Sequence, residues 1–364
     1  MNSRKFYSLL FITFFVTTAL LHGQTQPASP LMPIGKALQI KAPLGLPPVV
    51  IPSDNPPTVE TIALGRRLFY DPILSADRTV SCASCHAPQF GFADARPLSE
   101  GVGQKKGSRH SPPVVNAAYF HVQFWDGRAP TLEAQAEGPV QNPVEMANTL
   151  KTVEQRLNAD PSYRRQFTEA WGPKPIVYTM VEKSIASFER TVISGNSPFD
   201  RWKYGHDKNA VDNSVKRGFV VFSSAKKGNC AACHTIGEKY ALFTDNKFHN
   251  VGVGVDMGQF TDVGQFAVTH NEADKGKFKT PSLRSVALRP PYMSDGSLTD
   301  LKQVIDFYIG AGNSNPNLDQ QIHVLDFLTG QERTDLEAFL NALNGEVPPN
   351  VGPPDATKTQ VSRK

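Results

Sequence analysis

Apolar residues recur at helical spacing in several stretches of this chain. After Thr58 they repeat every three to four residues, with Leu64 and Leu68 one turn apart, and the pattern stops at Asp71. This period predicts an amphipathic helix, and the proline that follows Asp71 ends it because proline cannot continue a helix. A longer stretch of the same kind, from Val177 to Val192, predicts another helix.

Capping signals mark two further helices. Asp160 followed by Pro161 is a typical helix start, and Gly172 is a typical stop. Near the C-terminus, Thr329 and Glu332 form the pattern of a capping box ahead of a periodic apolar stretch. Alternating strand patterns are sparse, so we predict a mainly α fold with long loops.

The two ends of the chain differ in composition from the middle. Residues 1–24 hold Arg4 and Lys5, then an apolar run, which is typical of a secretory signal peptide and predicts a periplasmic protein. Left uncleaved, this run would tether the protein to a membrane, and no later run suits a stable membrane span. Residues 25–57 are rich in proline and predict an extended arm, and residues 348–364 predict a flexible tail.

The formal net charge of +4 changes this picture little. Arg4 and Lys5 supply two of the positive charges, and no basic stripe with interleaved aromatic residues is present. We therefore expect no nucleic-acid partner.

The motif C-x-x-C-H occurs twice and uses all four cysteines of the chain: Cys82-Ala83-Ser84-Cys85-His86 and, 148 residues later, Cys230-Ala231-Ala232-Cys233-His234. In this motif two thiols bind a c-type haem covalently and the histidine binds its iron. Zinc or a redox dithiol would also use C-x-x-C pairs, but neither explains the histidine after each pair. We predict two covalently bound haem c groups, and export fits because c-type cytochromes mature outside the cytoplasm.

A second feature repeats ahead of each motif. Gly65 and Gly218 each lie four residues before a phenylalanine on a predicted short helix. Glycine within a helix usually marks the close approach of another group, here a haem edge or a facing helix. Chance similarity of two unrelated helices is the alternative. We predict two related haem domains, residues 58–200 and residues 201–347.

Five stretches carry a wider resemblance: Leu64-Gly65-Arg66-Arg67-Leu68-Phe69, Phe124-Trp125-Asp126-Gly127-Arg128-Ala129, Asn142-Pro143-Val144-Glu145-Met146, Phe248-His249-Asn250-Val251-Gly252 and Lys279-Thr280-Pro281-Ser282-Leu283-Arg284. With the two haem motifs, they make the chain resemble the bacterial di-haem cytochrome c peroxidase family, including its MauG-like branch, from about Ala63 to Leu343. The resemblance implies two cytochrome c-like haem domains, the first peroxidatic and the second for electron transfer.

The resemblance also implies roles for three other side chains. Trp125 matches the tryptophan that relays electrons between the haems, Glu145 matches the glutamate that moves protons, and Gln135 matches the glutamine that assists it. A bound peroxide must lose a proton from one oxygen and gain one on the other before the O–O bond breaks. Without the resemblance, Trp125 would be a core tryptophan and Glu145 a surface carboxylate.

Three positions depart from the family. In many members a loop histidine binds the peroxidatic iron in the resting state, and its match here is Val102, which cannot bind iron. We therefore predict a first haem with an open or water-bound sixth position. His110 and His121 lie nearby and would be substitutes, although each is also explained as a surface or core histidine.

The second departure concerns the distal ligand of the second haem. The family methionine, 74 residues after the motif histidine, is replaced by Tyr308, and the MauG-like branch binds iron with a tyrosine at this place. Methionine raises the haem potential, whereas an anionic phenolate favours ferric and higher states. Tyr308 is thus a predicted iron ligand, with Met293 as the competing ligand and a core tyrosine as the alternative.

The third departure concerns a calcium ion that the family holds between its domains with an asparagine and two backbone carbonyls. His110 replaces the asparagine, while the carbonyls of Arg289 and Pro291 remain available. Imidazole is a poor calcium ligand compared with oxygen, so calcium stays an open question for this chain. Ser294 stands where the family often has histidine, and nothing in the sequence explains that change.

The expected function is the reduction of hydrogen peroxide to water by a periplasmic enzyme, with electrons from a small cytochrome c or cupredoxin. One alternative is MauG-like oxidation of a protein or organic substrate through a bis-ferryl-type state. The other is a non-enzymatic di-haem electron carrier. The resemblance also allows a homodimer.

Overall fold

The computed structural model describes Met1 and residues 31–354 of the chain. The predicted signal peptide therefore lies outside the described residues apart from Met1, as do residues 25–30 of the predicted arm and residues 355–364 of the predicted tail. Within the described part, no helix combines the length and the apolar character that crossing a bilayer requires.

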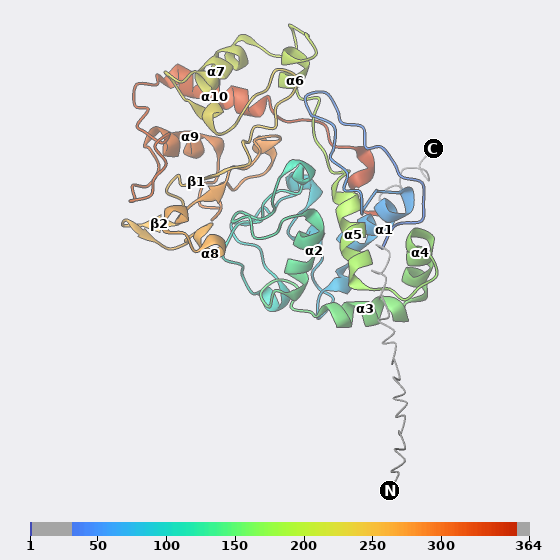
Figure 1. Cartoon of the computed structure of the whole chain (residues 1–364). Helices are drawn as coiled ribbons and strands as arrows, with labels where there is room; N and C mark the ends of the chain where they lie inside the picture. The colour runs from blue at the N-terminus through green and yellow to red at the C-terminus, as the bar shows by residue number, and fades with distance from the viewer. Residues whose placement is uncertain (2–30, 355–364) are drawn as a thin grey trace. The chain divides into compact units, whose positions relative to one another are not determined.

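The described residues form a mainly helical fold with long loops, as the sequence predicted (Figure 1). The α-helices are α1 (Val59–Tyr70), α2 (Leu132–Gln141), α3 (Leu150–Ala159), α4 (Pro161–Trp171), α5 (Tyr178–Glu189), α6 (Pro198–Lys203), α7 (Asn213–Ser223), α8 (Phe266–Thr269), α9 (Leu301–Ile309) and α10 (Gly330–Asn341). The strands are two residues long and pair antiparallel, β1 with β4 and β2 with β3: β1 (Phe248–His249), β2 (Val255–Asp256), β3 (Gln259–Phe260) and β4 (Phe278–Lys279).

Three helices start where the sequence predicted, and two of them, at Asp160 and Thr329, carry the predicted capping signals. The side chain of Thr58 accepts a hydrogen bond from the first turn of α1, and the side chain of Asp160 does the same for α4. Thr329 begins α10 with the predicted capping box. The longer predicted helix is α5, which ends at Glu189 rather than at Val192 because its last turn tightens into a 3₁₀ turn.

Two helix pairs, α1 with α5 and α7 with α10, pack in the same way (Figure 1). A Cβ atom added at Gly65 of α1 would lie 1.8 Å from the carbonyl oxygen of Ser184 in α5. A Cβ atom added at Gly218 of α7 would likewise lie 1.8 Å from the carbonyl oxygen of Asp335 in α10. Each glycine lets two helix backbones touch, so the group that the glycines were predicted to face is a helix.

Each helix pair has its own hydrophobic core. One cluster of buried side chains comes from α1 to α5 and includes Leu68 and Trp171. The other comes from α6, α7, α9 and α10, where the rings of Phe199 and Phe339 meet edge to face with centroids 5.5 Å apart. The chain therefore builds one core before α6 and a second core from α6 onward.

The described parts of the two terminal segments are tied to these cores. Residues 31–57 form the described part of the predicted arm, in which the carbonyl oxygen of Gly45 accepts a hydrogen bond from the buried Arg284. At the other end, the carbonyl oxygen of Val351 accepts a hydrogen bond of 2.8 Å from the hydroxyl of Tyr70 on α1. Val351 is itself buried against the first half of the chain, so the start of the predicted tail is packed.

Candidate functional site

Two cavities lie beside the two C-x-x-C-H motifs. The first has a volume of about 440 Å³ and the second a volume of about 200 Å³. The six predicted attachment residues line them: Cys82, Cys85 and His86 the first, and Cys230, Cys233 and His234 the second. Each motif thus presents two thiols and one imidazole to a single cavity.

The histidines of the two motifs are held in the same way. The Nδ1 atom of His86 lies 3.3 Å from the carbonyl oxygen of Phe92, and that of His234 lies 2.9 Å from the carbonyl oxygen of Phe243. An Nδ1–H that donates to a carbonyl leaves Nε2 without a proton, which is the form in which imidazole binds a metal. Burial also lowers the pKa of His86 to about 4, so this imidazole is neutral at neutral pH.

These donors suit haem c better than zinc. All four cysteines are free thiols, and each pair is accompanied by the histidine of its own motif and by a cavity. Among residues 31–354, no three side chains of histidine, cysteine, aspartate or glutamate gather closely enough to hold a metal ion. Two thiols and one imidazole at a large cavity are the attachment chemistry of haem c.

Gln135 and Glu145 both line the first cavity. Gln135 lies on α2, and Glu145 lies on the loop after it, where the side-chain amide of Asn142 donates a hydrogen bond of 2.6 Å to its carboxylate. Glu145 is half-buried, and burial raises the pKa of its carboxyl although the Asn142 bond opposes this shift. The first cavity therefore combines an amide and a carboxyl group that holds its proton more tightly than usual.

The loop at Val102 places no imidazole over this cavity. The backbone N–H of Val102 donates a hydrogen bond of 2.8 Å to the carbonyl oxygen of Glu145, and its side chain packs against the first core. His121 is exposed and lines neither cavity. His110 lines both cavities, but its Nδ1 lies 3.1 Å from the carbonyl oxygen of Arg96.

A small group of residues forms a wall that the two cavities share. His110, Pro113, Trp125 and Lys279 line both cavities. The indole N–H of Trp125 donates a hydrogen bond of 2.8 Å to the carbonyl oxygen of His110, and the carbonyl oxygen of Trp125 accepts one of 2.8 Å from the backbone N–H of Lys279. Hydrogen bonds thus hold both the side chain and the backbone of Trp125 in place between the cavities.

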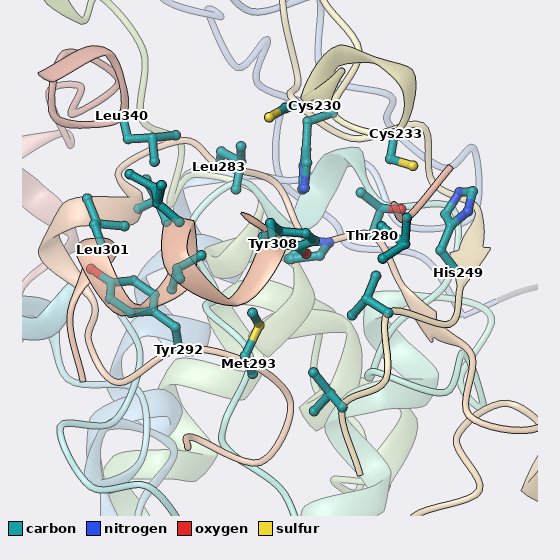
Figure 2. A pocket seen from close by; sticks show the side chains of 18 of the residues that line it. Cys230, Cys233, His249, Thr280, Leu283, Tyr292, Met293, Leu301, Tyr308 and Leu340 are labelled. Atoms are coloured by element: carbon teal, nitrogen blue, oxygen red, sulfur yellow. The ribbon is translucent and has the colours of Figure 1, made fainter. Parts of the chain in front are cut away.

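The second cavity is lined mainly by apolar side chains (Figure 2). Figure 2 shows Tyr308 at the centre of this cavity, with the sulfur atoms of Cys230 and Cys233 on one side and Met293 on the other. Burial raises the pKa of the Tyr308 hydroxyl well above its usual value. Both predicted candidates for the distal iron ligand, Tyr308 and Met293, therefore line the cavity, and His323 at its exposed rim is a third that the sequence did not suggest.

A second internal repeat relates the walls of the two cavities, with a constant spacing of 169 residues. A bridge between Gln123 and Ala129 in the first half has its counterpart between Tyr292 and Leu298 in the second. The residues after Gln123 and Tyr292 both have positive φ angles, and α2 and α9 both begin after the bridge. At this spacing, Pro139 of α2 takes the position that Tyr308 takes on α9.

Sequence reasoning gave no role to the charged side chains of three buried residues beside the cavities, although it named Arg289 for its backbone carbonyl and quoted Lys279 within a family stretch. Glu189 lines the first cavity with its Oε2 atom unpartnered, and burial raises its pKa to about 8. Lys279 lines both cavities and Arg289 lines the second. None of the three stands out in the sequence because a single charged residue in a loop or at a helix end is usually exposed. The 169-residue repeat would have pointed to Lys279, since it matches His110.

The predicted calcium ligands lie near the seam between the two halves. Pro291 and Arg289 line the second cavity, and the backbone N–H of His110 donates a hydrogen bond of 2.8 Å to the carbonyl oxygen of Ser294. The buried guanidinium group of Arg289 therefore shares this region with the imidazole of His110. The position of Ser294 shows one use for that residue, since its carbonyl joins the two halves.

The chain is similar to several known proteins. The family description "Di-haem cytochrome c peroxidase" matches residues 59–208. The methylamine utilization protein MauG of Methylorubrum extorquens is 42% identical over 298 residues, which cover 81% of this chain and 81% of MauG. The cytochrome c551 peroxidase of Pseudomonas aeruginosa is 38% identical over 291 residues, covering 78% of this chain and 79% of the peroxidase.

A solved structure agrees with these relatives. A MauG-like protein associated with microbial copper homeostasis superposes with a TM-score of 0.79 and 32% sequence identity, covering 86% of this chain and 98% of that protein. Identity of this extent over four fifths of the chain, together with two cavities that present thiols and imidazoles, shows that the chain belongs to the di-haem cytochrome c peroxidase family of oxidoreductases.

Proposed function

We propose that this protein reduces hydrogen peroxide to water with two electrons from a small periplasmic redox protein. The observation that carries the proposal is the set of side chains that line the first cavity. That cavity holds Gln135 and Glu145 together with the His86 motif, and it shares Trp125 with the second cavity. In the reaction, one peroxide, two protons and two electrons give two water molecules.

The proposal assigns one haem c to each cavity. The first group would be attached through Cys82 and Cys85 and the second through Cys230 and Cys233, with His86 and His234 as iron ligands. When bound, the haem iron supplies a binding position for peroxide and the electrons that break its O–O bond. Two haem domains, one around each helix pair, follow from the same assignment.

Glu145 would carry the proton transfer. A carboxylate within reach of both peroxide oxygens takes a proton from one and returns it to the other, which makes water the leaving group. Burial raises the pKa of Glu145, and a carboxyl group with a raised pKa is better matched to proton transfer near neutral pH. The hydrogen bond from Asn142 would hold the carboxyl group in position, and the amide of Gln135 would orient the oxygens.

Trp125 would carry electrons between the cavities. Its indole is buried, lines both cavities and is fixed by hydrogen bonds of 2.8 Å through its side chain and its carbonyl. The donor, a small cytochrome c or cupredoxin, would dock over the second cavity, where the rim includes exposed residues such as His323. The predicted signal peptide supports a periplasmic location.

Peroxide consumption by the purified di-haem protein tests the proposal. We expect continuous turnover only when a reduced cytochrome donor is present, and we expect a Trp125→Phe variant to be slowed in the transfer of electrons between the haems. Trp202→Phe is the matched control, because Trp202 packs in the second core and lines neither cavity. A di-haem electron carrier would instead take up and release electrons without consuming peroxide.

MauG-like oxidation of a protein or organic substrate is the second candidate, and one observation favours it. Tyr308 lines the second cavity together with Met293. A phenolate ligand stabilises oxidised iron. A Tyr308→Phe variant would change the optical and EPR spectra of the second haem if tyrosine binds the iron, while Met293→Leu would leave them unchanged. The reverse result would assign the ligand to Met293 and favour the peroxidase.

A further inference from the structure

Two buried cations beside the cavities have no acidic partner. Five lysine and arginine residues are buried among residues 31–354, and three of them pair with carboxylates: Lys183 with Asp54, Arg190 with Glu133 and Arg284 with Asp200. The other two are Lys279, 6% exposed, and Arg289, 8% exposed, and neither forms an ion pair within that part of the chain. Both of them line at least one of the two cavities beside the cysteine motifs, whereas the three paired cations line neither.

The polar atoms of these two side chains are poorly satisfied. The Nε atom of Arg289 is buried without a hydrogen-bond partner, and its Nη2 donates only to the carbonyl oxygen of Ser282. The ammonium group of Lys279 lies 3.6 Å from the centre of the Phe120 ring and makes no hydrogen bond with the described residues. A buried charge without a partner costs several kcal/mol, as an order of magnitude, so both sites call for an anion.

The titration behaviour of the two groups agrees with this geometry. Burial lowers the pKa of Lys279 to about 7 and that of Arg289 to about 10. Burial is the main cause of both shifts, and an anion bound in the cavity would oppose it. Haem carries two propionate carboxylates, so each haem brings such anions into its cavity.

The same region is unfavourable for a calcium ion. His110 stands where the family has an asparagine ligand, and its Nδ1 lies 3.1 and 3.2 Å from the carbonyl oxygens of Arg96 and Pro97. Calcium takes six to eight oxygen ligands, and an imidazole supplies none. Burial is the main cause that lowers the pKa of His110, and the nearby guanidinium group of Arg289 adds a smaller effect in the same direction. The same positive charge would repel a divalent cation there.

Arg289 also belongs to the contact between the two halves. A Cβ atom added at Gly91, in the first half, would lie 3.4 Å from the Cβ of Arg289. Lys279 is on β4 and its backbone N–H bonds to the carbonyl oxygen of Trp125, so it too joins both halves. The two cations are therefore fixed between the cavities by contacts with each half.

We propose that Arg289 and Lys279 form a built-in cationic site for haem propionates, which takes the place of a calcium ion between the two cavities. The site rests on haem binding in the two cavities and does not depend on peroxide turnover. Arg289 would pair with a propionate of the second haem. Lys279 lines both cavities and would pair with propionates of both haems. With both haems bound, the propionates would balance the two buried positive charges, and the protein would need no calcium ion to fold.

Calcium itself provides the first test. We expect the purified di-haem protein to contain no bound calcium by elemental analysis, to show no heat of binding when calcium chloride is added, and to keep its optical spectrum in excess EGTA. A double variant, His110→Asn with Arg289→Gln, restores an oxygen ligand and removes the opposing charge, so we expect it to gain calcium binding. Tight calcium binding by the unaltered protein would overturn the proposal.

Redox titration of the two haems provides the second test. A fixed positive charge favours the reduced haem, so Arg289→Gln should lower the reduction equilibrium constant of the second haem about tenfold, which is 59 mV for one electron. Arg289→Lys keeps the charge and should restore most of the potential. The propionate carboxylate bands in the infrared spectrum should shift in Arg289→Gln and not in Arg289→Lys.

The matched control is Arg165→Gln, an exposed arginine on α4 that lines neither cavity. If Arg289→Gln shifts neither the potential nor the carboxylate bands more than Arg165→Gln does, Arg289 is not a propionate site. If Arg289→Gln does not fold, the calcium measurement on the unaltered protein and the Arg289→Lys titration still decide. Failure of peroxide turnover would contradict the proposed function and leave these readouts unaffected.

Discussion

The two cavities are alike at the cysteine motifs and differ in the rest of their lining. In both, a 3₁₀ turn carries the thiols, and the histidine Nδ1 lies within 3.3 Å of a carbonyl oxygen. In both, a glycine lets two helix backbones touch. In the rest of the lining, the first cavity has Gln135, Pro139 and Glu145, whereas the second has Tyr308 and Met293.

This difference indicates which residues distinguish the chemistry of the two cavities. Pro139 and Tyr308 are matched by the 169-residue repeat, and proline has no side-chain atom that can bind iron. At the matched position the second half therefore has a phenol group where the first half has none, and Gln135 and Glu145 line the first cavity instead. Under the proposed function, one attachment framework would serve a reactive site in the first half and an electron-transfer site in the second.

The largest expected effect comes from removing the carboxyl group of Glu145, one of the carboxyl groups that line the first cavity and not the second. Glu145→Gln keeps the size of the side chain but cannot take up a proton, so peroxide turnover should fall by about 10²–10⁴-fold. Steady-state kinetics with a cytochrome donor measure this. Glu169→Gln, on the exposed face of α4, is the control and should retain full activity. Equal activity of the two variants would remove the functional distinction between the cavities.

Removing a buried charge should show that the two halves also differ in stability. Glu133 on α2 pairs with Arg190, and both are largely buried at an N–O distance of 2.7 Å. Glu133→Gln leaves the guanidinium buried without its partner and should lower the free energy of unfolding by about 3–5 kcal/mol. Denaturant unfolding followed by circular dichroism measures the change. Glu137→Gln, one turn further along α2, should change it far less.

The glycine contacts should be equally sensitive in the two halves. Gly65→Ala and Gly218→Ala each place a Cβ 1.8 Å from a carbonyl oxygen of the facing helix. The helices must separate, which should cost about 1–3 kcal/mol or more in each variant. Gly330→Ala is the control, since a Cβ there meets no atom within 4 Å. Thermal unfolding measures the loss in each variant. Clearly different losses for Gly65→Ala and Gly218→Ala would mean that the two helix pairs are not equivalent.

The pH dependence of turnover should identify Glu145 as the group that titrates. Burial raises its pKa, and only the ionised carboxylate accepts a proton from peroxide. Below this raised pKa, kcat/KM for peroxide should therefore fall by about tenfold per pH unit, and above it the rate should reach a plateau. Glu145→Gln should give a flat profile over the same range. A profile that keeps its slope in this variant would assign the titration to another residue.

The smallest effect is expected at the position in the second half that matches Glu133. Lys302 on α9 forms an exposed pair with Asp306 at 2.7 Å. Solvent screens an exposed ion pair, so Lys302→Met should leave the unfolding free energy nearly unchanged. The same denaturant measurement compares it with Glu133→Gln. A loss of several kcal/mol at Lys302 would mean that the two positions are more alike than their burial implies.

Much of the fold could be predicted because its signals act over short distances in sequence. The capping residues Thr58, Asp160 and Thr329 begin their helices as predicted, since a cap is a hydrogen bond to a residue two or three positions away. The family and the mainly helical class also followed from motifs. The partner of Gly65 remained open between a haem edge and a helix until its contact with Ser184 was seen.

The functional site could be predicted only where a motif or the family resemblance named its residues. Glu145, Gln135 and Trp125 were named in this way, and the structure places them on cavity walls. The side chains of Glu189 and Lys279 were given no role, because their burial depends on segments far away in the sequence. A charged side chain becomes chemically unusual when water and counter-charges are removed from it, and no local pattern records that removal.

By itself, the sequence determined the two sets of thiols and imidazoles, the helix starts and the family, because covalent chemistry and backbone hydrogen bonds link residues a few positions apart. The tertiary structure alone decided which side chains the two cavities share and which buried charges lack a partner. Trp125 and Lys279 are 154 residues apart in the chain yet line the same two cavities. Packing between such distant segments sets the burial, and burial sets the electrostatics of the site.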